Sequence, residues 1–171
     1  MASVTIQDDC LAPEGYMTLK YNGPIPFKAY YVTITFMRKI WEVEAKDYWE
    51  REFRWDNTSD PRSFFVKAYV HKGIDRFTSV TIEVILEGKQ PADSNKPGSL
   101  LIKIGGVLTT KFGGGSVLQD ARNPIYAGLV WLYNHLFYRK QRRDYLEIWC
   151  KRRLYELKRM YQEFLGITES E

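Results

Sequence analysis

Hydrophobic and polar side chains alternate along much of the chain up to residue 112, which is typical of strands with one buried and one solvated face. The segments that show this alternation are 16–21, 41–56, 64–70, 76–88 and 99–112. A turn around Gly73 separates the third segment from the fourth, so we expect these two to form a hairpin. In the last segment, Gly105 and Gly106 predict a bulge or the close approach of another chain.

Residues 25–40 fit two patterns, because apolar residues alternate as in a strand and also recur at helical spacing. The four β-branched residues 32–35 favour a strand. Pro26 could equally open a helix. We predict a strand for this segment.

The pattern changes after residue 122, where Asn123 and Pro124 form a typical helix start. Two apolar stripes at helical spacing follow, one made of Tyr126, Leu129, Tyr133 and Leu136, the other of Leu146, Cys150, Leu154, Leu157, Tyr161 and Phe164. A single straight helix over 123–165 would be about 60 Å long, which exceeds a small domain. We therefore expect two helices, or one helix kinked near 138–144.

Strands that come first and helices that come last predict an α+β fold. We expect an antiparallel sheet of about five strands, followed by two C-terminal helices, or one long kinked helix, packed on the sheet. The expected organisation is a loose N-terminal leader over 1–14 and a single domain over 15–171. Within the domain, the sheet spans 15–112, a Gly-rich connector 113–122 and the helices 123–165.

Positive charge is concentrated near the C-terminus. The whole chain carries a net charge of +4, whereas residues 139–159 carry nine Lys and Arg against three acidic residues, and the rest is slightly negative. Such a local field attracts nucleic acid, an anionic membrane or an acidic protein. The alternative is that the Lys and Arg stems only cover the edges of the apolar stripe, with their charges in water.

We predict that this basic, aromatic helical region binds a partner. The candidate residues are Arg139, Lys140, Arg142, Arg143, Lys151, Arg152, Lys158 and Arg159 for charge, with Trp149 and Tyr155 as flat contacts. A protein partner or a homo-oligomer is the first expectation, and nucleic acid is the second, since such residues grip phosphates and stack on bases. The same pattern also describes a helix at an anionic lipid surface.

No catalytic motif is present in the sequence, so we predict a non-enzymatic protein without cofactor or metal. The segment FGGGS (112–116) lacks the ending of a phosphate-binding loop. His71 and His135 have no metal-ligand spacing. The spacing of Cys10 and Cys150 suggests no disulfide. Together with an N-terminus unlike a signal peptide and the lack of a long apolar run, this predicts a reducing, cytoplasmic location.

Three segments carry a resemblance, namely LKYNGP (19–24), WEVEAKDY (41–48) and YNHLFYRKQRRDY (133–145). In layout and scattered residues the chain resembles a loose group of small archaeal α+β proteins without assigned function. The resemblance transfers no catalytic residue, and so it implies an interaction protein.

At the level of the fold, the expected layout is similar to helix-grip domains of the START or Bet v1-like kind, which hold apolar ligands between sheet and helix. The chain departs from them in having two terminal helices and no clear pair of short helices after the first strand. This similarity implies an alternative function as a carrier of a small apolar ligand. Its cavity, roughly 300 Å³ or more, would lie between Trp41, Trp49, Phe53, Trp55 and Tyr69 and the helical residues Leu146, Trp149 or Leu157.

Overall fold

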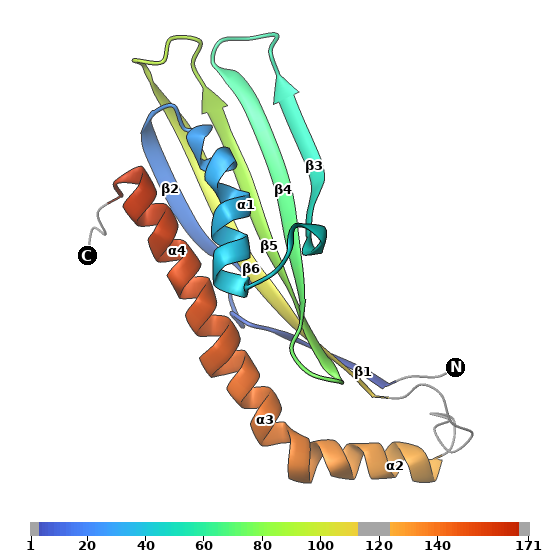
Figure 1. Ribbon diagram of the computed structural model, residues 1–171. Coiled ribbons are helices and arrows are strands. Elements are labelled where there is room, and N and C mark those ends of the chain that lie inside the picture. The colour runs from blue at the N-terminus through green and yellow to red at the C-terminus, as the bar shows by residue number, and fades with distance from the viewer. Residues whose placement is uncertain (1–3, 113–123, 168–171) are drawn as a thin grey trace.

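The computed structural model describes residues 4–112 and 124–167, which form an antiparallel sheet of six strands with helices on one face (Figure 1). The strands are β1 (Val4–Asp9), β2 (Met17–Pro24), β3 (Tyr48–Asp56), β4 (Arg62–Gly73), β5 (Thr78–Gln90) and β6 (Pro97–Phe112). Their order is β1-β6-β5-β4-β3, and β2 also pairs with β6. Between β2 and β3 lie α1 (Lys28–Trp41) and a short 3-10 turn, η1 (Ala45–Asp47).

The C-terminal helical region is continuous but not straight. It consists of α2 (Pro124–Tyr133), the π-helical turn η2 (Asn134–Tyr138), α3 (Arg139–Asp144), a second π-helical turn η3 (Tyr145–Cys150) and α4 (Lys151–Leu165). From α3 to α4 the helix runs along the sheet, whereas α2 turns sharply away from that axis (Figure 1). The turn coincides with η2, in agreement with π-turns as a cause of kinks. The α+β class and the long C-terminal helical region are therefore confirmed, with six strands in the sheet.

The predicted strand over 25–40 is wrong, because residues 28–41 form α1. The residues that α1 buries lie on one side of a helix: Ala29, Thr33, Met37, Ile40 and Trp41. Packing of this face against α4 and the sheet outweighs the strand preference of the β-branched run. Because α1 continues to Trp41, the strand predicted from residue 41 begins only at Tyr48.

The predicted loose leader is also corrected. Residues 4–9 form β1, which pairs with β6 from Asp9 opposite Val107 to Val4 opposite Phe112. After β1, the chain passes Gly105 and Gly106 in the middle of β6. Strand β2 then pairs with the half of β6 that precedes these two glycines. A Cβ atom on Gly105 would lie 2.9 Å from the carbonyl oxygen of Gly15, so the backbone that approaches this glycine belongs to the same chain. The predicted connector 113–122 lies outside the described residues.

The core lies between the sheet and the two helices α1 and α4. Alternate residues of β4, β5 and β6 are buried on this face, as in Val66, Val84 and Ile102. The hydroxyl of Thr33 in α1 is also buried there, where it donates to the carbonyl oxygen of Ala29. The opposite face of the sheet has no helix of the described residues over it, and its side chains are half-exposed and mixed in polarity.

Candidate docking surface

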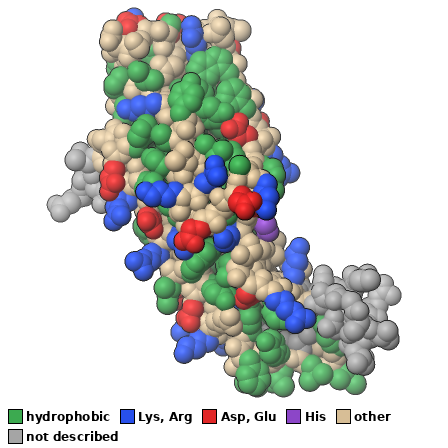
Figure 2. All heavy atoms as spheres, in the orientation of Figure 1, with side chains coloured by type: hydrophobic (Ala, Val, Ile, Leu, Met, Phe, Trp, Pro, Cys, Tyr) green, Lys and Arg blue, Asp and Glu red, His purple; other side chains and the backbone are tan. Residues whose placement is uncertain are grey.

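Residues 124–138, comprising α2 and η2, form a helical arm that projects from the end of the sheet (Figure 1). The arm has no Asp, Glu, Lys or Arg. Its exposed large apolar side chains are Ile125, Leu129, Trp131, Leu132, Tyr133, Leu136 and Phe137, with exposed fractions from 44% to 72%. Figure 2 shows hydrophobic side chains gathered at this lower end of the molecule. A helix that is apolar around almost its whole circumference is typically buried in a protein core or in a membrane.

Tyr138 anchors the arm to the sheet. Its side chain is buried, and its hydroxyl donates to Oδ2 of Asp75 at 2.8 Å and also bonds to the hydroxyl of Thr78. Its ring contacts those of Phe77 and Phe112 at 6.0 and 5.4 Å between centroids. Burial, together with the nearby Asp75 carboxylate, raises the pKa of the Tyr138 hydroxyl well above its ordinary value. The arm is thus held at its base, while its apolar surface faces outward.

A basic elbow, defined as Arg139, Lys140 and Arg143, follows directly after the arm. All three side chains are exposed, and none forms an ion pair with a described residue. The Arg139 guanidinium lies 3.5 Å from Nε2 of His135, whose ring stacks on Trp131. The elbow therefore places positive charge that forms no ion pair within the described residues next to the apolar arm.

Arg142, the fourth predicted basic residue of this segment, contributes to the fold instead. Its Nε lies 2.9 Å from Oδ2 of Asp8, and both side chains are about three-quarters covered. The pair connects α3 to β1. The charge of Arg142 is therefore paired within the fold.

The predicted site residues of α4 lie apart from the arm. Arg152, Tyr155, Lys158 and Arg159 line a surface hollow of about 870 Å³, together with Glu156 and Glu163. Arg159 pairs with Glu163 at 3.4 Å. The acidic side chains reduce the positive potential along this part of α4. Lys151, at the start of α4, is exposed and lies outside the hollow.

Trp149 is not a flat contact surface. It is half-buried, its ring meets that of Trp41 edge-on at 5.3 Å, and the guanidinium of Arg153 covers it at 4.7 Å. Arg153 in turn donates to the carbonyl oxygen of Ile40 and pairs with Glu42. These contacts hold the end of α1 against the C-terminal helix, which leaves Tyr155 as the exposed aromatic candidate.

The residues of the predicted ligand cavity are not brought together. Trp41 and Leu157 are fully buried in the core, and Leu146 and Trp149 are half-buried. Phe53 and Trp55 pack against Phe27, which directly precedes α1, whereas Trp49 and Tyr69 are paired on the opposite face of the sheet. The space between sheet and helices is filled by fully buried side chains, including Met37, Leu154 and Tyr161.

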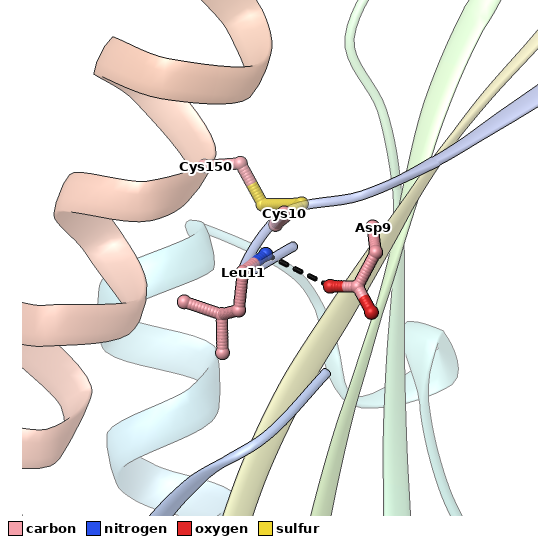
Figure 3. The surroundings of a disulfide bond; sticks show 4 residues. All are labelled: Asp9, Cys10, Leu11 and Cys150. Atoms are coloured by element: carbon pink, nitrogen blue, oxygen red, sulfur yellow. Dashed lines mark hydrogen bonds between the residues drawn. A yellow bond between two sulfur atoms is a disulfide. The ribbon is translucent and has the colours of Figure 1, made fainter. Parts of the chain in front are cut away.

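Cys10 and Cys150 form a disulfide, which contradicts the sequence-based expectation (Figure 3). Cys10 follows β1 directly, and Cys150 is the last residue of η3, 140 residues later. The neighbouring turn is held by the amide of Leu11, which donates to Oδ1 of Asp9 at 2.8 Å. The disulfide and the Asp8–Arg142 pair together attach the N-terminal strand to the C-terminal helical region.

The apolar residues of the arm were not predicted to form an exposed surface, because the stripe from Tyr126 to Leu136 was expected to cover the sheet. The signal that distinguishes them is the absence of any Asp, Glu, Lys or Arg over 124–138, which leaves the arm without a polar face. His71 lies on β4 with Nδ1 3.2 Å from the hydroxyl of Thr81.

Within residues 4–112 and 124–167, no group of three or more His, Cys, Asp and Glu side chains could hold a metal ion. None of the described helices combines the length and apolar character needed to cross a bilayer. Comparison with protein-family models and with curated proteins found no match to this chain.

Proposed function

We propose that this chain is a non-enzymatic binding or assembly protein that acts through its C-terminal helical region, with the helical arm as the part that docks. The observation that carries the proposal is the set of large apolar side chains exposed along residues 124–138. Contiguous exposed apolar surface of this kind marks an interaction site in a folded protein. A partner for this surface combines an apolar area with negative charge, since the basic elbow lies beside the arm.

A protein partner or a second copy is the expectation from the sequence, and a protein that combines apolar and acidic side chains fits this surface. Nucleic acid is less well supported. Trp149 is covered by Arg153, Arg142 is neutralised by Asp8, and acidic residues interrupt the basic row of α4. Phosphate binding needs several uncompensated cations in reach of one backbone.

The alternative of a carrier for a small apolar ligand has a weaker basis in the described residues. A carrier needs an enclosed pocket that buries most of its ligand. Trp41, Met37 and Tyr161 occupy the space that such a ligand would need. We retain the carrier as a second proposal because the sheet with helices on one face has the layout of helix-grip domains.

A cytoplasmic location also remains a proposal, and the disulfide bears on it. Disulfides are rare in reducing compartments, except in intracellular proteins of hyperthermophiles. The redox state of Cys10 and Cys150 in protein taken from quenched cells tests the location. Fully reduced cysteines would agree with an ordinary cytoplasm, and a complete disulfide would contradict it outside a hyperthermophile.

Site-specific photo-crosslinking in cells tests the docking role without assuming the partner. A photo-reactive phenylalanine analogue would replace Phe137 on the arm or Tyr31 on α1, which are exposed to 70% and 67% respectively. We expect a photo-adduct, detected by intact mass of the purified chain, from position 137 and only background from position 31. Equal, diffuse labelling from both positions would refute a docking role for the arm.

A further inference from the structure

We propose that the arm binds an anionic lipid bilayer, with its apolar side chains among the acyl chains and the basic elbow at the headgroups. This inference rests on the proposed docking role of the arm and names its partner. Three features favour lipid over other partners: the breadth of the apolar surface, the length of the arm and the position of the charges.

The apolar surface of the arm is too broad for one partner helix. At about 100° per residue, the exposed residues Trp131, Leu132, Leu129 and Tyr133 of α2 extend over about 200° of the helix circumference. The stripe that a helix buries against a single packed neighbour is about 100° wide. A bilayer covers the arm from several directions at once and so accounts for the whole surface.

The arm has the length of a helix that enters one leaflet. Its 10 residues of α2 and 5 residues of η2 extend for about 20 Å, compared with about 30 Å for a full hydrocarbon core. The turn at η2 directs α3 and α4 away from the arm, so the sheet can remain outside the bilayer while the arm lies in it (Figure 1).

The charges favour lipid over a second copy. Arg139, Lys140 and Arg143 lie at the junction of arm and body, where headgroups would be when the arm is inserted. Each Lys or Arg near an anionic surface strengthens binding roughly five-fold, so the three together give about a hundred-fold preference for anionic over neutral lipid. In a parallel pair of arms, two basic elbows would instead lie side by side and repel.

Vesicle flotation of the full chain tests the inference. The probes are vesicles of phosphatidylcholine alone and of phosphatidylcholine mixed with phosphatidylserine, at about 0.1 and 1 M salt, where the screening length falls from about 10 to 3 Å. We expect binding to the mixed vesicles about a hundred-fold stronger than to the neutral ones, with much of that preference lost at high salt.

Three variants localise the binding, and an unchanged thermal unfolding curve confirms that each is folded. Leu129→Asp with Leu136→Asp alters two exposed arm residues and should abolish binding to both kinds of vesicle. Lys140→Ala with Arg143→Ala should remove about 30-fold of the preference for anionic lipid. Tyr31→Asp, at an equally exposed apolar position on α1, should bind as the wild type does.

Absence of binding of the wild type to the mixed vesicles, or equal binding by the arm variant, would overturn the lipid assignment. Sedimentation velocity separates this failure from that of the docking role. Arm-dependent self-association without vesicle binding would refute lipid and leave the docking role in place. If position 137 also gives no adduct in cells, the docking role fails as well.

Discussion

The hydroxyl oxygens of Thr33 in α1 and Tyr161 in α4 lie 2.7 Å apart in the buried interface between the two helices. Thr33 donates its only hydroxyl hydrogen to the carbonyl oxygen of Ala29, so Tyr161 donates to Thr33. Residues 128 positions apart are thus joined by a hydrogen bond inside an apolar core. This bond fixes the register of the two helices that cover the sheet.

Thr33→Val should destabilise the protein more than Tyr161→Phe does. The valine leaves the buried Tyr161 hydroxyl without its acceptor, which costs about 1–3 kcal/mol of unfolding free energy, whereas removing the tyrosine hydroxyl costs about 1 kcal/mol. Urea denaturation of both single variants and the double variant would measure this. Strict additivity of the two effects would show that the hydroxyls are not coupled.

Stability should decrease above about pH 10. Burial raises the pKa of the Tyr161 hydroxyl above its ordinary value, so the unfolded chain loses this proton at a lower pH than the folded chain does. The contribution is therefore fully present below the unfolded pKa and declines by about 1.4 kcal/mol per pH unit above it. Denaturation between about pH 8 and 11 should show a shallower decline in Tyr161→Phe. An identical slope in that variant would contradict the assignment.

Reduction of the Cys10–Cys150 disulfide should lower the unfolding free energy by about 2–5 kcal/mol, because the bond closes a long loop in the unfolded chain. Denaturation with and without reductant measures the difference. The control is Cys10→Ser with Cys150→Ser, on which reductant should have no effect. A wild type that responds as little as this control, or a non-reducing peptide map without the Cys10–Cys150 fragment, would contradict the bond.

Arg142→Glu should destabilise the protein by about 1–2 kcal/mol, because it places two carboxylates together where α3 meets β1. The matched control is Arg143→Glu, whose side chain is exposed and should change stability by less than about 0.5 kcal/mol. Combining Arg142→Glu with Asp8→Arg should restore much of the loss. Thermal unfolding of the four proteins would show whether the pair exists, since equal melting temperatures for the two single variants would exclude it.

Local periodicity was sufficient for the β4–β5 hairpin and the C-terminal helical region, because these depend on nearby residues and on one repeating spacing. It failed for α1, where a β-branched run that favours a strand is held as a helix by distant packing. The disulfide and the Asp8–Arg142 pair join segments more than 130 residues apart, and no spacing within one segment encodes such contacts.

The candidate site was partly predicted. Charge counting located the basic elbow, but it could not reveal that Arg142 is neutralised by Asp8 or that Trp149 is covered by Arg153. The apolar stripe of α2 was predicted, but its exposure to solvent was not. The bend at η2 takes the stripe past the end of the sheet, so the same residues are exposed instead of buried.

The native size of the protein in a gently prepared cell lysate tests the docking role of the arm most directly. The chain alone has a mass of 20.1 kDa. We predict that the wild type and Tyr31→Asp migrate with a much larger particle, and that Leu129→Asp with Leu136→Asp migrates at the size of the free chain. A wild type that migrates as the free chain, or an arm variant that keeps the large size, would contradict the account.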